Sequence, residues 1–536
     1  MHASVPLFVS LAAYPLFKLA EYIYREYNSP LRRLPGPDSP SWIYGNFKEI
    51  WENDNSVVHE RWVATHGPTL KYKGLFGMTR LFTMDTKALT HILMNGNYQK
   101  PESSRYHLRQ LLGEGLLVAE GDKHRQQRRI MNPAFGPYQI RELTEIFVDK
   151  AIELRDALEV ELTKQEGAAR VDILPWLSKT TLDVIGLAGF NYNFNSLSSV
   201  TDTNELRNAF STLFKAGGRL PLIPFIREMF PVLRFLPAER DAETKKARLT
   251  MDRIGNDLLK RSQAAAMAEK DASGAKDSRK GRDLLSLLVR ANVTTDLPDD
   301  QRMNDDDVVA QVPTFLVAGH ETTSVGTTWA LYALTQHPHA QEELREELIS
   351  VSSDNPTMDE LNALPYLDAV VRETLRIHAP VPSSFRVAKQ DDVIPLETPI
   401  KDLDGNVLDH IRVNKGQVLF IPILAINRAV SIWGEDAGEF KPERWKSIPK
   451  AASSIPGVWG NLLTFLGGHH ACIGYRFSII EMKALLFTLI RAFEFQLAVP
   501  PAEIKKKTSV VQRPVLASDP EAKNQMPLLI KAYQRP

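Results

Sequence analysis

The sequence predicts one large, mainly α-helical fold with a small β portion. Apolar side chains recur every three to four residues through long stretches in the middle of the chain and again after Gly474, which is the period of amphipathic helices. Alternating, strand-like segments are few and lie near the two ends of the chain. Hydrophobic residues make up 43% of the 536 residues, which is ample for one large core, although this length could also form three average domains.

Composition excludes some classes of function. Lys and Arg together number 65, as do Asp and Glu, so the net charge is zero and no overall field favours binding to nucleic acid. The chain has one cysteine, Cys472, and therefore no intramolecular disulfide. This argues against a secreted, disulfide-stabilised protein.

Residues 1–33 predict a membrane anchor that precedes a folded body over residues 34–536. Residues 3–17 carry no charged side chain, and a helix of that length reaches about 22 Å against roughly 30 Å of hydrocarbon. Extending the helix to Ala20, with the Lys18 ammonium reaching back to the interface, brings it close to a full span.

The flanking charges predict how this anchor is oriented. Arg25, Arg32 and Arg33 follow the apolar segment, so the positive-inside rule places the folded body in the cytosol. Pro6 and Pro15 weaken the helix, and a tilted or monotopic anchor is an alternative. A cleaved signal peptide is the other alternative, but no Lys or Arg precedes the apolar run.

The first part of the body mixes helix and strand signals. Residues 34–37 read Leu-Pro-Gly-Pro, which ends any helix and predicts a stiff hinge. Residues 42–65 include a plausible helix, and residues 69–84 alternate like a hairpin, with Gly74 and Gly77 at its turns.

Two later segments depart from the helical pattern. Residues 217–237 are rich in apolar side chains and prolines, which fits ordinary core. Residues 262–283 are polar and nearly without large apolar groups, so we expect a surface loop there.

His124 and Arg128 share one face of a predicted helix in the segment 121–135, because they are four residues apart. On these residues alone, a solvated basic helix is the ordinary interpretation.

A long helix is expected from Asn304 to His337, with a kink at Pro313. A glycine, an acid and two threonines interrupt its apolar pattern at residues 319–323 (Gly-His-Glu-Thr-Thr). The glycine and the threonines lower helix propensity, and the acid is costly to bury, so several residues that destabilise a buried helix occur at one place. Such a concentration indicates a functional site.

A further helix is predicted over residues 367–377, begun by Pro365, with Glu373 and Arg376 three apart on one face. An exposed pair of this kind contributes little and carries little information alone. Strand-like segments follow, with Asp404-Gly405 at a hairpin turn and residues 417–421 as a returning strand.

Cys472 lies in the stretch Phe465-Leu-Gly-Gly-His-His-Ala-Cys-Ile-Gly474, directly before a predicted helix. A lone cysteine is often a small buried hydrophobe. Here, however, Gly467, Gly468 and Gly474 remove side chains around the sulfur, which lets backbone approach something large and flat. A helix N-terminus also favours a thiolate, and a thiolate is a strong axial ligand of haem iron.

The spacing Phe-x-x-Gly-x-x-x-Cys-x-Gly resembles the haem-thiolate signature of the cytochrome P450 family. Its companion motifs follow in family order from about residue 30: the proline-rich hinge, the segment 121–135, Ala-Gly-His-Glu-Thr-Thr at 318–323, Glu-x-x-Arg at 373–376, and Phe-Lys-Pro-Glu-Arg-Trp at 440–445. The chain departs from the family where His470 replaces the usual arginine, His124 a tryptophan, and Trp445 a phenylalanine.

The resemblance places the folded body at the endoplasmic reticulum membrane, with residues 217–237 as a loop that borders the substrate channel and touches the membrane. It also implies roles for particular residues. Cys472 would be the iron ligand, and Glu321 and Thr322 would deliver protons to dioxygen, which Gly319 lets approach the helix backbone. Glu373, Arg376 and Arg444 would form a buried structural network behind the haem. The expected cofactor-binding residues are Cys472, His124, Arg128, Arg386, Phe465, Gly468, His470 and Gly474, with Arg128, Arg386 and the two histidines directed at haem propionates.

The resemblance also implies an activity and its partners. We expect a monooxygenase that uses haem b, O2 and electrons from a membrane NADPH–cytochrome P450 reductase to oxidise a lipophilic substrate. The fungal character of the motifs favours a terpenoid or another specialised metabolite. The alternatives are a P450-like isomerase or dehydratase that needs no reductase, and a haem-binding sensor or carrier, both of which the Glu321–Thr322 pair argues against.

Overall fold

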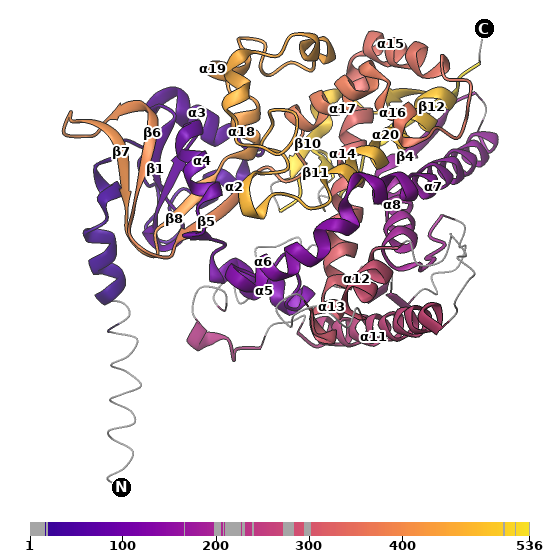
Figure 1. Ribbon diagram of the computed structural model, residues 1–536. Helices are drawn as coiled ribbons and strands as arrows, with labels where there is room; N and C mark the ends of the chain where they lie inside the picture. The colour runs from indigo at the N-terminus through magenta and orange to yellow at the C-terminus, as the bar shows by residue number, and fades with distance from the viewer. Residues whose placement is uncertain are drawn as a thin grey trace.

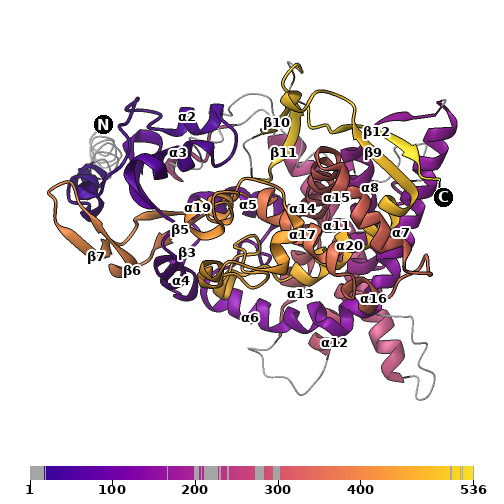
Figure 2. The same ribbon diagram turned by 90° about the horizontal axis from the view of Figure 1, so that it is seen from above.

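Helix α14 (Gln311–Gln336) is the element around which the other long helices pack. It contacts α8 (Ile173–Phe190), α17 (Pro365–Ile377) and α20 (Tyr475–Ala492), and the two perpendicular views place all three beside it (Figures 1 and 2). The computed structural model describes residues 17, 20–165, 167–197, 205–206, 208–209, 227, 231–237, 241–271, 283–293, 302–507, 510–519, 521 and 523–534.

Most of the described chain is helical. The other helices are α2 (Phe47–Glu52), α3 (Val57–His66), α4 (Thr86–Met94), α5 (Glu102–Leu112), α6 (Gly121–Met131), α7 (Pro137–Thr163), α11 (Asp241–Asp271), α12 (Leu284–Val293), α13 (Asp305–Val309), α15 (Pro338–Ile349), α16 (Met358–Asn362), α18 (Ile423–Asn427) and α19 (Val430–Trp433). Short 3-10 turns join them, among them η6 (Pro442–Lys446) and η8 (Gly468–His470).

The strands form small sheets at the edge of the helical body (Figure 1). A five-stranded sheet has the order β1-β2-β8-β5-β3, in which only β2 and β8 run parallel. A three-stranded sheet has the order β4-β12-β9, and β6-β7 and β10-β11 are separate hairpins. The strands are β1 (Thr69–Lys73), β2 (Thr79–Thr83), β3 (Tyr98–Gln99), β4 (Ala169–Asp172), β5 (Ser384–Ala388), β6 (Asp392–Lys401), β7 (Val407–Val413), β8 (Val418–Ile421), β9 (Phe493–Leu497), β10 (Ile504–Lys507), β11 (Arg513–Leu516) and β12 (Pro527–Ala532).

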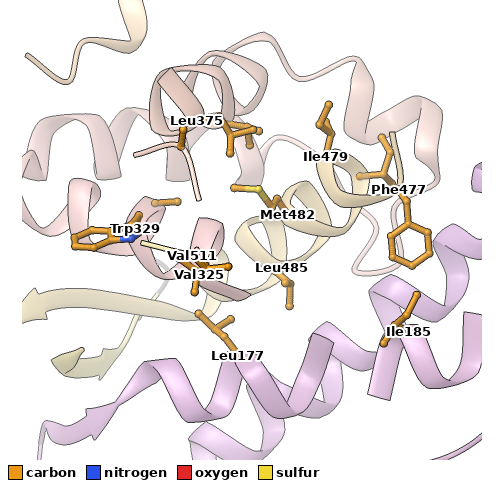
Figure 3. Close-up of a cluster of buried hydrophobic side chains, with 14 of the residues drawn as sticks. Leu177, Ile185, Val325, Trp329, Leu375, Phe477, Ile479, Met482, Leu485 and Val511 are labelled. Carbon is orange, nitrogen blue, oxygen red and sulfur yellow. The ribbon is translucent and has the colours of Figure 1, made fainter. Parts of the chain in front are cut away.

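The main hydrophobic core lies between the long helices. Figure 3 shows Val325 and Trp329 of α14 near Met482 and Leu485 of α20, and Leu177 of α8 approaching from the other side. Each of these side chains is almost fully removed from water. The apolar stripes predicted from the sequence therefore meet in one continuous core.

Several predicted elements are present. The α17 helix begins at Pro365, the β1–β2 hairpin turns through Gly74 and Gly77, and α20 follows Gly474 directly. The helix expected over residues 304–337 is split into α13 and α14, with the break at Ala310. Pro313 explains the break, because it has no N–H to donate to the carbonyl of Val309, where α13 ends.

The loop expected over residues 262–283 is partly wrong. Helix α11 continues to Asp271, so the first part of that segment is helical. The segment lacks large apolar groups but contains four alanines between residues 264 and 268, and alanine has the highest intrinsic helix propensity.

Two expected membrane segments lie mostly outside the described residues. These are the anchor, of which residues 1–16, 18 and 19 are not described, and the apolar segment 217–237, of which only residues 227 and 231–237 are. None of the helices in the described part of the chain has the length and apolar composition needed to cross a bilayer.

Residues just before the hinge already belong to the folded body. The Tyr22 hydroxyl donates to the carbonyl of Phe76 at 2.7 Å, and the Glu26 carboxylate accepts from the backbone N–H of Thr79 at 3.1 Å. Leu31 is fully buried. The contacts of the body thus extend at least to Tyr22.

Candidate active site

Cys472 lies at the end of a tightly folded loop that leads into α20. Its backbone N–H donates to the carbonyl of Phe465 at 2.8 Å, which closes the loop around the 3-10 turn η8. The ring of Phe465 packs against Trp459 and Tyr475. Gly474 is the residue immediately before the helix. The backbone therefore fixes where the sulfur stands.

Two glycines of this loop are required by close packing against the protein's own backbone. A Cβ on Gly467 would lie 1.7 Å from the carbonyl oxygen of Pro456, and one on Gly468 would lie 2.0 Å from that of Leu93. Gly468 also has φ +69°, a conformation that side chains disfavour. Both glycines are needed because the loop presses against the protein's own backbone at these two positions.

The Cys472 side chain remains accessible to solvent, although protein atoms crowd around it. This crowding raises the pKa of the thiol, while the Gly474 N–H and the Arg128 charge act in the opposite direction. The helix N-terminus acts on the thiol in the expected direction through the Gly474 N–H, but burial outweighs it. A bound metal cation would reverse this balance, because a coordinating thiol loses its proton.

Cationic side chains from two parts of the chain, α6 and β5, lie near the cysteine loop. Arg128 of α6 donates to the carbonyl of Ala471, the residue next to the cysteine, and to Asn132 Oδ1 at 2.9 Å. Arg386 of β5 is 1% exposed and donates through Nη1 to Ser384 and to the carbonyl of Phe385. Its Nη2 is buried without a hydrogen-bond partner.

The two histidines of the motifs lie together. The rings of His124 and His470 are 4.1 Å apart between centroids, and His470 Nε2 is 3.0 Å from Glu120 Oε2. Burial lowers the pKa of His124 to about 3 and also lowers that of His470. Both rings are therefore neutral at pH 7, and His470 Nε2–H donates to the Glu120 carboxylate.

Glu120 and Lys100 complete this cluster, and the sequence reasoning missed both. Burial alone would raise the pKa of Glu120, but the hydrogen bond with His470 and the Lys100 charge hold it well below its usual range. Burial lowers the pKa of Lys100 to about 8, so it stays largely protonated at pH 7. Because acids and lysines are common next to helix starts, no sequence signal distinguished these two.

Glu373, Arg376 and Arg444 meet in a fully enclosed network. Arg376 donates to both oxygens of Glu373, at 2.8 and 2.9 Å, and neither side chain is exposed. Arg444 of η6 lies 3.4 Å from Glu373, and the Trp445 indole donates to it at 3.1 Å. The indole bond uses the one residue in this motif that departs from the family.

This network is connected to the cysteine loop. Arg376 also donates to the carbonyl of Asn427 at 3.0 Å. The Asn427 side chain accepts from the N–H of Leu463 at 2.9 Å and donates to Thr464 Oγ1 at 2.8 Å. The buried charges therefore fix the start of the loop that carries Cys472.

The interrupted segment of α14 is continuous helix. Thr322 Oγ1 donates to the carbonyl of Ala318 at 2.7 Å, and Glu321 pairs with Arg513 of β11. A Cβ on Gly319 would lie 2.9 Å from Ile185, so this glycine lets α8 pack closely on α14. Burial lowers the pKa of His320 to about 4.

The comparisons with known proteins agree with this geometry. The cytochrome P450 family model matches residues 34–518. Cytochrome P450 monooxygenase 205 of Postia placenta is 56% identical over 531 residues, covering 99% of this chain and 98% of the relative. The chain belongs to the cytochrome P450 family.

Further relatives carry the same kind of name. Cytochrome P450 monooxygenase 128 of Postia placenta is 51% identical and covers 98% of this chain and 97% of the relative. Cytochrome P450 monooxygenase claQ of Ampulloclitocybe clavipes is 33% identical, with 94% of each chain covered. This P450 is accordingly a monooxygenase, with haem as its cofactor and with dioxygen, a substrate and a redox partner as its reactants.

The residues around Cys472 fit a haem. Arg128, Arg386 and Lys100 are cations and Glu120 is an anion, so two positive charges remain in the cluster, which matches the two propionate carboxylates of haem. The partnerless Nη2 of Arg386 is a buried donor that a carboxylate would satisfy. With Cys472 as the soft ligand for iron, the donor set is complete.

We predict that Glu373→Gln lowers the unfolding free energy by about 3–5 kcal/mol, because it leaves the buried Arg376 guanidinium without its counter-charge and leaves Arg444 with Asp436 alone. Trp445→Phe, which removes one hydrogen bond to the same carboxylate, should cost only about 1–2 kcal/mol. Thermal unfolding of the three proteins measures this order.

Asp359→Asn is the matched control, because it breaks an ion pair with Arg141 in which both side chains are largely exposed. Its unfolding temperature should equal that of the unmodified protein. Equal losses for Glu373→Gln and Asp359→Asn would contradict a structural role for the buried network.

Proposed function

We propose that this P450 holds haem b through Cys472, receives electrons from an NADPH–cytochrome P450 reductase and inserts one oxygen atom of O2 into a lipophilic substrate, a terpenoid or a similar specialised metabolite. The observation that carries the proposal is the cysteine loop, whose sulfur stands beside a buried cluster with two excess positive charges. Haem supplies the oxidising chemistry, and the protein supplies binding, orientation and protons.

Haem retention rests on charge as well as on the iron–sulfur bond. Arg386 and Arg128 would bind the propionates, because guanidinium groups match carboxylates in charge and geometry. His470 and His124 would border the same carboxylates. Since His470 Nε2–H donates to Glu120, its Nδ1 offers a lone pair, so in the neutral ring this nitrogen accepts rather than donates a hydrogen bond.

Thr322 and Glu321 would manage the protons. The Thr322 hydroxyl gives its own proton to the carbonyl of Ala318, so its oxygen is free to accept a hydrogen bond from an incoming water. Glu321 is the neighbouring carboxylate that would take up protons and pass them on. These proton transfers lead to product only if the site excludes other water molecules.

The reductase would dock where basic side chains gather near the cysteine. A surface hollow of about 220 Å3 is lined by His124, Arg125, Arg128, Arg129, Asn132 and His469. This charge would attract an acidic protein and speed its encounter. The hollow lies over α6, whose Arg128 contacts the residue next to Cys472.

Residues before the body would anchor it to the endoplasmic reticulum membrane, with the catalytic part in the cytosol. Large apolar side chains near this end are exposed, among them Trp42 at 80% and Tyr24 and Tyr27 at 70%. Aromatic side chains of this kind favour the membrane interface.

We predict that Thr322→Ala leaves the haem spectrum unchanged and diverts electrons from product into hydrogen peroxide, because a held water is lost from the proton path. The measurement is the ratio of peroxide formed to NADPH consumed, with purified reductase and a terpene that shifts the Soret band. We expect this ratio to rise about tenfold.

Thr328→Ala is the control, because Thr328 makes the same kind of bond, to the carbonyl of Ser324 at 2.8 Å, further along α14. An unchanged peroxide ratio in Thr322→Ala would remove the proton-delivery role. If the substrate were converted without any NADPH consumption, the isomerase or dehydratase alternative would replace the monooxygenase.

We predict that deleting residues 1–19 releases the protein from microsomes and leaves its unfolding temperature unchanged. Deleting residues 1–33 should release it too, but should also lower the unfolding temperature, since Glu26 and the fully buried Leu31 are lost. Sedimentation with membranes and thermal unfolding separate the two effects. Retention of the shorter deletion on membranes would place the main attachment elsewhere in the chain.

A further inference from the structure

The acid of α14 has a partner that comes from the far end of the chain. Arg513, in strand β11, pairs with Glu321 through Nη2 and Oε1 although 192 positions separate the two residues. Their side chains are 16% and 17% exposed. A long-range ion pair with so little exposure is only weakly screened by solvent.

Burial makes it costly for Arg513 to carry its charge without a partner. Removal from water lowers the pKa of the Arg513 guanidinium, which shows that its charge is costly to hold there. The neighbouring His320 is neutral at pH 7, because burial lowers its pKa to about 4. Among the described residues, Arg513 is therefore the cation that the structure pairs with the Glu321 carboxylate.

The β10–β11 hairpin is fastened to α14 at a second point. The Trp329 indole donates to the carbonyl of Gln512 at 2.8 Å, and the N–H of Gln512 donates to the carbonyl of Pro380 at 2.8 Å. Lys506 of β10 lies over the Trp329 ring. Both views place β10 and β11 beside α14 (Figures 1 and 2). Trp329 is about two helical turns from Glu321 on α14, and it binds the carbonyl of Gln512, the residue before Arg513. The backbone of Arg513 is therefore held close to Glu321.

We propose that Arg513 is a positioning residue for proton delivery: it keeps Glu321 ionised and fixes the carboxylate at one place beside Thr322. This inference rests on the proposed function, because it assigns the setting of an acid that the proposed function uses. A carboxylate held in this way takes a proton from water only briefly and passes it on toward Thr322. Without the cation, a poorly hydrated carboxylate retains its proton and can turn away from Thr322.

The test compares Arg513→Met, Arg513→Lys, Glu321→Gln and the double variant Arg513→Met/Glu321→Gln, all as holoenzyme. Lys505→Met is the control, because it removes an exposed cation from the same hairpin. Each protein is given one electron by a chemical reductant, mixed with oxygenated buffer in H2O or in D2O, and then given the second electron that dioxygen cleavage requires by a light-activated reductant. The rate of the following absorbance change is measured, which reports proton delivery independently of the electron donor.

We expect Arg513→Met to slow this step about tenfold and to enlarge its solvent isotope effect, as Glu321→Gln does. Arg513→Lys should recover most of the rate, since it restores the charge. The double variant should be no slower than Glu321→Gln alone, because both changes disable one proton path. Lys505→Met should match the unmodified protein.

A charge swap, Glu321→Arg with Arg513→Glu, separates positioning from stability. It should recover the unfolding temperature that Arg513→Met loses, and it should not recover the rate. Recovery of both would make the pair purely structural and would overturn the proposal.

Two further results bear on the proposal and on the proposed function separately. If Glu321→Gln slows the step and Arg513→Met does not, the positioning role fails while proton delivery by Glu321 stands. If Glu321→Gln itself has no effect, both fail.

Discussion

The position of the active-site loop depends on a single buried carboxylate, that of Glu373. Glu373 is wholly enclosed, and a charge in that position is tolerated only because Arg376, Arg444, the Trp445 indole and the Lys441 N–H all donate to it. These donors come from α17 and from the segment around η6. Satisfying the one charge therefore joins two regions that are distant in the sequence, and through Asn427 it fixes the start of the cysteine loop.

The position of Cys472 follows from this buried network and from close backbone packing. Gly468 brings the loop against α4, and the hydrogen bond from Cys472 to Phe465 closes it. The sulfur is thus held by the backbone, while Arg128, Arg386, Lys100 and Glu120 provide the net charge that two carboxylates require. One part of the site would hold the iron, and the other would compensate the propionates.

The sequence predicted what is local and missed what is long-range. The β1–β2 hairpin, α17 and α20 could be predicted because turn residues and apolar spacing determine them. The helical continuation of α11 could not be predicted from apolar spacing, because its alanines favour a helix without forming an apolar stripe. Glu120, Lys100 and Arg513 could not be found, because their partners are brought to them only by the tertiary fold. The glycines of the cysteine loop were recognised, but the surface they approach was not.

The claim that Cys472 is the thiolate ligand of haem is tested most directly by the absorbance spectrum of the reduced protein under carbon monoxide. The unmodified protein should show the thiolate-specific Soret band, and Cys472→Ala should lose it, because the chain has no other thiol. His470→Ala, which removes a nearby imidazole, should keep the band. A thiolate band that persisted in Cys472→Ala, or one that was absent from the unmodified haem-loaded protein, would contradict the account.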